Sequence, residues 1–71
     1  MNYVNESIKC DFKVPIGLQE LIDLAEQADR DKDFGSYINY ADAIDTVAKN
    51  CCFDGTITKH MWDLLVYRYV V

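Results

Sequence analysis

Acidic side chains spaced three residues apart are the groups of this chain that could do chemistry. Asp42 and Asp45 would share one face of a helix, where paired carboxylates can transfer protons or bind a metal. A two-metal site in a helical bundle needs Glu-x-x-His pairs on facing helices. His60 is the only histidine, and with Asp63 it forms a His-x-x-Asp pair, the reverse of the acid-then-His order that such a site uses. We interpret these charges as a solvated helix face and expect a non-enzymatic protein with no catalytic residue.

The segment Asp54–Thr58 is similar to the middle of an EF-hand calcium loop. In both, a ligand Asp, a turn Gly and a small hydrophobic residue precede a helix. If Asp54 takes the fifth loop position, Cys52 takes the third and Met61 the twelfth. The loop needs an oxygen ligand at the third position and a bidentate Glu at the twelfth. We therefore interpret the segment as a turn followed by a helix cap.

A second stretch with calcium-like spacing contains Asp29, Asp31 and Asp33, which alternate along the chain. Phe34 stands where the loop glycine is expected, and Gly35 follows one position late. This pattern favours a solvated turn whose last Asp caps the next helix. The alternative is weak, incidental calcium binding. We expect no metal site and no cofactor.

The cysteines predict no disulfide framework and no zinc site. Cys10, Cys51 and Cys52 form no C-x-x-C pair, and their number is odd. A single histidine, His60, leaves too few ligands for tetrahedral zinc. The first residues lack the basic and apolar regions of a signal peptide, and no apolar run reaches the ~20 residues that span a bilayer. We expect a cytoplasmic protein without membrane contact.

Length and composition predict one small domain with more apolar residues than its interior needs. A chain of 71 residues buries only ~60% of its unfolded surface, yet 51% of the residues are hydrophobic and 13% aromatic. This surplus favours a homo-oligomer or a permanent partner. The net charge of −5 disfavours nucleic-acid binding, which depends on Lys and Arg neutralising phosphates.

Hydrophobic periodicity predicts an all-α fold, a three-helix bundle with an extended N-terminal arm. We expect the arm at residues 1–14 and the three-helix domain at 15–71, with helices near 16–29, 34–52 and 59–69. Alternating apolar residues from position 8 to 14 predict an arm with one buried face. The apolar stripe of the first helix comprises Leu18, Leu21, Ile22, Leu24, Ala25 and Ala28. That of the second comprises Phe34, Tyr37, Ile38, Ala41, Ile44, Val47, Ala48 and Cys51.

The last third of the chain organises the rest. Thr58 is a good N-cap, and Ile57 and Trp62 have the spacing of a hydrophobic staple. Apolar residues then cover most of the helix circumference, more than one stripe requires. We expect a homodimer, or another protein partner, bound through this helix and one terminus. The main alternative is that the N-terminal arm covers this surface. The residues that we expect to bind the partner are Trp62, Leu65, Val66, Tyr69, Val70 and Tyr40.

The stretch G-x-I-T-K-H-x-W-D-L-L, from Gly55 to Leu65, loosely resembles small helical proteins of bacterial mobile elements and prophages, a group with no assigned activity. This resemblance implies a small accessory protein and no particular chemistry. The leading hypothesis is therefore a non-catalytic protein that acts through protein–protein interaction or self-association. The alternative is a DNA-binding regulator of the helix-turn-helix type, in which the third helix would offer only Lys59, His60 and Arg68 to the major groove.

Overall fold

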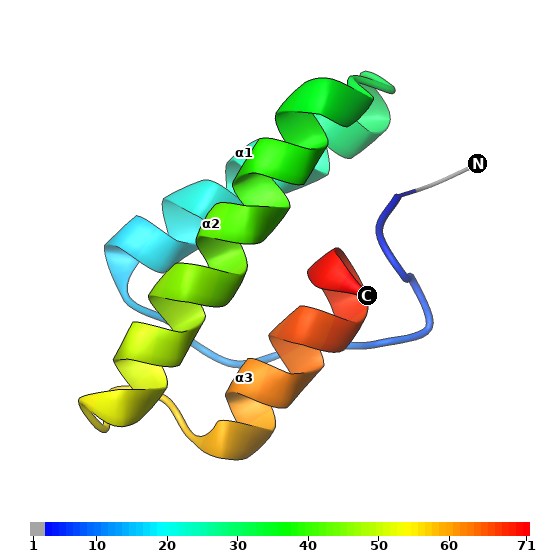
Figure 1. The fold of residues 1–71 in the computed structure, drawn as a ribbon. Helices are drawn as coiled ribbons and strands as arrows, with labels where there is room; N and C mark the ends of the chain where they lie inside the picture. Colours follow the sequence, from blue (N-terminus) through cyan, green and yellow to red (C-terminus); the bar gives the residue numbers. More distant parts are fainter. Residues whose placement is uncertain (1–2) are drawn as a thin grey trace.

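The computed structural model describes residues 3–71 and contains three α-helices. They are α1 (Ile16–Arg30), α2 (Phe34–Phe53) and α3 (Lys59–Leu65), and α3 continues into a π-helical turn, η1 (Val66–Val70). Figure 1 shows α1 and α2 side by side as a hairpin, with α3 and η1 against α2 and the N-terminal arm passing behind α3 to reach α1. The expected all-α fold is confirmed, and residues 3–71 contain no strand.

The α1–α2 turn is closed by backbone groups and by the expected cap. The amide of Asp33 donates to the carbonyl of Ala28 (2.9 Å), and the amide of Lys32 donates to the carbonyl of Asp29 (3.2 Å). These two bonds form a Schellman motif, whose left-handed position is usually glycine. Here Lys32 occupies that position, with φ of 57°. Asp33 caps α2 by accepting from the amide of Ser36 (3.2 Å), as the sequence predicts.

The turn from α2 to α3 uses the same motif with glycine in place. Gly55 has φ of 85°, and the next amide, that of Thr56, donates to the carbonyl of Cys51 (2.9 Å). Thr58 caps α3 by accepting from the amide of Met61 (3.1 Å), which confirms the predicted cap. The buried Ile57 anchors the chain where it enters α3. The prediction that residues 54–58 form a turn followed by a helix cap is therefore confirmed.

The predicted helix 59–69 begins as expected but changes its hydrogen bonding after Leu65. The amide of Val71 donates to the carbonyl of Val66 (2.9 Å), five residues earlier, as in a π-helix. Within this turn Tyr69 is buried and Tyr67 is 54% exposed. The turn therefore directs one tyrosine into the core and the other to solvent.

The core has one fully buried large side chain from each helix: Leu18, Ile44 and Leu65. Small residues between them let the helices approach closely, and Val4, Ile57 and two tyrosines complete the cluster. Three members of the predicted stripes are exposed, while the others lie in this cluster or pack against it. Leu24 is 45% exposed, Phe34 55% and Ile38 41%. The stripes are narrower than predicted, because the buried positions of α2 centre on Tyr37, Ala41, Ile44 and Ala48, and Phe34 and Ile38 lie at their edge.

The described part of the N-terminal arm lies across the helices of its own chain. The amide of Asn5 donates to the carbonyl of Arg68 (2.8 Å), which joins the arm to η1. The predicted alternation is confirmed, since residues 8, 10, 12 and 14 are half-buried and residues 9, 11 and 13 are exposed. The arm is thus a structural part of the domain. No helix of the described chain is long and apolar enough to cross a membrane.

Candidate protein-binding surface

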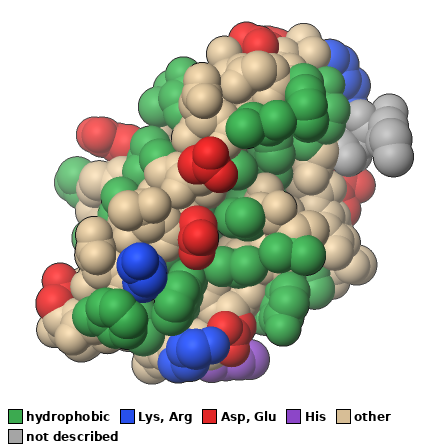
Figure 2. Space-filling model, viewed as in Figure 1, with side chains coloured by type: hydrophobic (Ala, Val, Ile, Leu, Met, Phe, Trp, Pro, Cys, Tyr) green, Lys and Arg blue, Asp and Glu red, His purple; other side chains and the backbone are tan. Residues whose placement is uncertain are grey.

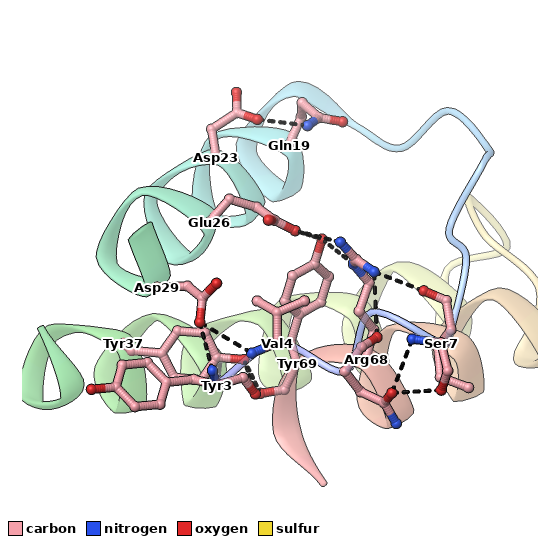
Figure 3. A network of polar contacts seen from close by, with 12 residues as sticks. Tyr3, Val4, Ser7, Gln19, Asp23, Glu26, Asp29, Tyr37, Arg68 and Tyr69 are labelled. Carbon is pink, nitrogen blue, oxygen red and sulfur yellow. Dashed lines mark hydrogen bonds and ion pairs between the residues drawn. The ribbon is translucent and has the colours of Figure 1, made fainter. Parts of the chain in front are cut away.

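A network of polar contacts fixes the C-terminal helical turn against α1 (Figure 3). The hydroxyl of Tyr69 donates to Oε2 of Glu26 (2.7 Å), and the Arg68 guanidinium forms an ion pair with the same oxygen (3.1 Å). Arg68 also donates to the carbonyl of Ile8 in the arm (2.8 Å). Glu26 lies outside the apolar stripe predicted for its helix, so the sequence predicts a solvated carboxylate there, and this prediction is wrong. Its carboxylate is half-buried because Arg68 and Tyr69 are brought to it from the other end of the chain.

A second part of the network joins the arm, α1 and α2. Asp29 is buried, and its Oδ1 accepts from the backbone amides of Tyr3 (2.5 Å) and Val4 (3.3 Å). The sequence predicts a solvated turn residue here, and Asp29 is instead the acceptor that holds the arm. The hydroxyl of the buried Tyr37 donates to the carbonyl of Tyr69 (2.7 Å). These bonds fix the backbone that leads into Val70 and Val71.

The groups of this network are suited to a structural role, not to proton transfer or nucleophilic attack. Burial raises the pKa of Tyr37 to about 12, and burial with the hydrogen bond to Glu26 raises the pKa of Tyr69 further from neutrality. Burial also raises the pKa of the thiol of Cys10, a half-buried residue of the arm. Each of these groups is therefore held in its protonated form, which is a poor nucleophile and a poor base.

A groove lies next to this polar network, between the first half of α2 and the end of the chain. Its volume is about 330 Å³. Phe34, Ile38, Val70 and Val71 are its large exposed apolar side chains, and their exposed fractions run from 37% to 82%. Asp42 is the acidic residue of the lining. The remaining lining residues are Tyr3, Tyr37, Ala41 and Tyr69. Figure 2 shows hydrophobic side chains gathered on this face, with acidic side chains among them.

The other end of α2 carries a protruding aromatic side chain. Phe53 is 76% exposed, and its ring lies edge-on to the indole of Trp62, with centroids 6.1 Å apart. The Trp62 indole N–H donates to Oδ1 of Asp45 (3.1 Å), and the Lys59 ammonium lies 5.1 Å from the indole centroid. Phe53 is thus held in place from one side and exposed to solvent on the other.

The residues expected to bind a partner separate into three groups. Leu65 and Tyr69 belong to the core of the chain itself. Trp62, Val66 and Tyr40 are half-buried, and Val70 is exposed at the groove. The arm contacts the C-terminal turn at Arg68, as the main alternative requires, but Val70 beside it stays exposed. The role of Trp62, Val66, Val70 and Tyr40 in partner binding stays a prediction.

Sequence reasoning missed the residues that make the groove and the protrusion. The apolar stripe predicts Phe34 and Ile38 in the core, and the charge pattern predicts Asp42 on a solvated face. The sequence predicts no role for Phe53 or Val71. A signal for them exists in the spacing of α2. Ile38, Asp42, Lys49 and Phe53 fall within about 60° of one another on a helix with 3.6 residues per turn. That flank lies beside the buried positions of α2, not on them.

The residues considered for metal binding have other roles. The Asp54 carboxylate accepts from the hydroxyl and the amide of Thr56, and this hydrogen bonding lowers the pKa of Asp54. Asp63 forms an ion pair with Lys59. Among residues 3–71, no three His, Cys, Asp or Glu side chains gather at one point. Comparisons with protein-family models, curated proteins and solved structures gave no match.

Proposed function

We propose that this chain is a non-catalytic protein that acts by binding protein, through a surface made of the α2 flank and the groove beside it. The observation that carries the proposal is the groove, with Phe34, Ile38, Val70 and Val71 exposed around one recess. Apolar patches that a monomer keeps exposed are often functional. The fastened arm and the Glu26–Arg68 ion pair hold one wall of the groove in shape before a partner arrives.

Two other classes of function receive less support. For an enzyme, the buried tyrosines and Cys10 have pKa values raised away from neutrality, and Tyr69 and Tyr37 are engaged in structural hydrogen bonds. For a DNA-binding regulator, two of the three basic or imidazole side chains near α3 are engaged. Lys59 pairs with Asp63, and Arg68 pairs with Glu26 inside the domain. We propose that nucleic acid is not the partner.

We also propose that the protein works in the reducing cytoplasm and belongs to the group of small mobile-element proteins that it resembles. The three cysteines are free and half-buried, which suits such a compartment.

Site-specific photo-crosslinking tests the binding surface. A photoreactive phenylalanine analogue replaces Ile38 at the groove or, as a control, Glu20, which is exposed on α1. Both variants are expressed in cells and irradiated, and the adducts are identified by mass. We expect a reproducible protein adduct from position 38 and none from position 20. Adding Val70→Glu at the groove edge should abolish the adduct while leaving the helical circular dichroism unchanged.

The proposal fails if position 38 gives no more adduct than position 20. The adduct's partner also matters, because a second copy of this chain and a different protein give different masses.

A further inference from the structure

The α2 flank is complementary to itself when a second copy is placed antiparallel. The flank carries Ile38 and Asp42 in its first half and Lys49 and Phe53 in its second half, each pair four residues apart. In an antiparallel helix pair centred between residues 45 and 46, Ile38 faces Phe53 of the copy and Asp42 faces Lys49 of the copy. Each contact then occurs twice, as a two-fold axis requires.

We propose that the chain forms a two-fold dimer in which the flanks of two α2 helices pack antiparallel and Phe53 of each copy enters the groove of the other. This inference rests on the proposed function and names a second copy as the occupant of its surface. The groove has a volume of about 330 Å³ beside Ile38, and Phe53 is exposed where the copy would present it. Contact with Trp62 holds the Phe53 ring before association, which reduces the entropy that binding must remove.

Charge selects both the occupant and the register. Lys49 is the only basic residue of α2, and neither Lys49 nor Asp42 has an ion-pair partner within residues 3–71. A register centred between residues 43 and 44 would place Phe34 opposite Phe53, but it would also bring Asp42 opposite Asp45 of the copy. Like charges facing each other across an interface oppose association and suppress that arrangement. The register centred between 45 and 46 replaces this repulsion with two Asp42–Lys49 pairs.

The length of the surface suits a stable dimer. The 20 residues of α2 span about 30 Å, with an apolar contact at each end and a charge pair on either side of the axis. An exposed ion pair contributes little affinity by itself. The apolar contacts therefore supply most of the affinity, and the charge pairs fix the register.

Exchange of the two charges provides the test, with mass measured by light scattering after size exclusion from micromolar to several hundred micromolar protein. We expect wild type at twice the chain mass of 8.2 kDa. Asp42→Lys alone and Lys49→Asp alone should each be folded and monomeric, because each places like charges together. The double variant should regain the dimer, and so should an equimolar mixture of the two single variants.

Phe53→Ser tests the apolar contact, and Ile16→Ser is its matched control, since Ile16 is 81% exposed on α1 away from the groove. Two Phe53 side chains are buried per dimer, so Phe53→Ser should weaken dimerisation about 100-fold or more, whereas Ile16→Ser should change it little. A wild type at the mass of one chain throughout, or a dimer that ignores the charge exchange, overturns the inference.

The crosslinking result shows whether failure of the dimer also removes the proposed function. A monomeric wild type that still crosslinks a different protein from position 38 removes the dimer and keeps the binding surface. Loss of every adduct from position 38 removes both.

Discussion

Replacement of Asp29 by alanine is expected to release the N-terminal arm. Asp29 is 7% exposed, and its carboxylate accepts from the backbone amides of Tyr3 and Val4. A hydrogen bond to a charged group contributes about 1.5–3 kcal/mol. The Val4 contact, at 3.3 Å, is longer than the usual range and adds little. We expect Asp29→Ala to lower the free energy of unfolding by about 2–3 kcal/mol.

That loss is large for a domain of this size. At roughly 0.05–0.15 kcal/mol per residue, 71 residues give a total stability of roughly 4–11 kcal/mol. The loss also has a ceiling, because the arm can detach while α1 and α2 remain paired. Asp29→Asn keeps an acceptor oxygen but removes the charge, and neutral hydrogen bonds are about half as strong. It should therefore cost about 1 kcal/mol.

Urea unfolding and amide hydrogen exchange measure the two consequences. Asp31→Ala is the control, since Asp31 is exposed and its carboxylate accepts from the Gln27 side chain at the solvated end of the same helix. It should change stability by less than about 0.5 kcal/mol. The amide of Asn5, which donates to the Arg68 carbonyl, should lose protection in Asp29→Ala. If Asp29→Ala and Asp31→Ala are equally stable, or if Asn5 stays protected, the role assigned to Asp29 is refuted.

Three further predictions concern the turns and the buried tyrosines. Lys32→Gly should stabilise the fold by about 1 kcal/mol and Gly55→Ala should destabilise it by at least that much, because both positions have positive φ. Thermal unfolding measures both effects, and melting temperatures that shift in the same direction in the two variants would contradict this prediction. Thr58→Ala should cost about 1 kcal/mol through loss of the α3 cap, and an unchanged urea midpoint would disprove the cap's contribution. The pKa of Tyr37 is raised to about 12 from about 10 in the unfolded chain, so its contribution to the free energy of unfolding is complete below pH 10 and falls as the pH rises toward 12. Tyr37→Phe should make stability fall less steeply in urea titrations from about pH 9 to 12. An equally steep fall in the variant would contradict this prediction.

Features that depend on residues close together in the sequence were predictable from it. The Thr58 and Asp33 caps follow from side chains that reach amides three residues away, and helix positions follow from apolar spacing. The buried carboxylates were not predictable in this way. Glu26 meets Arg68 from 42 positions away, and Asp29 meets Tyr3 from 26 positions away. Without these partners, both acids fit a solvated helix surface.

The binding surface was predictable only in kind. An excess of apolar residues indicates that some stay exposed, but periodicity alone does not define the edge of a stripe. Ile38 and Tyr37 are neighbours in the sequence, yet Tyr37 is buried under the arm and Ile38 is 41% exposed. Which of them faces the core depends on the positions of the arm and η1. The change to π-helical bonding at Val66 has no sequence signal that we identify.

The arm contact also sets an order of events during synthesis. The arm binds Arg68 across 60 and 63 residues of chain, whereas the α1–α2 hairpin needs only nearby partners. We therefore expect the arm to complete its contacts last, once Arg68 and Tyr69 have been synthesised, even though its bonds to Asp29 can form earlier. At about 5–20 residues per second, synthesis of the 60 residues between Ile8 and Arg68 takes roughly 3–12 seconds, during which these contacts of the arm cannot form. During that interval the nascent chain is most open to chaperones, proteases and wrong contacts.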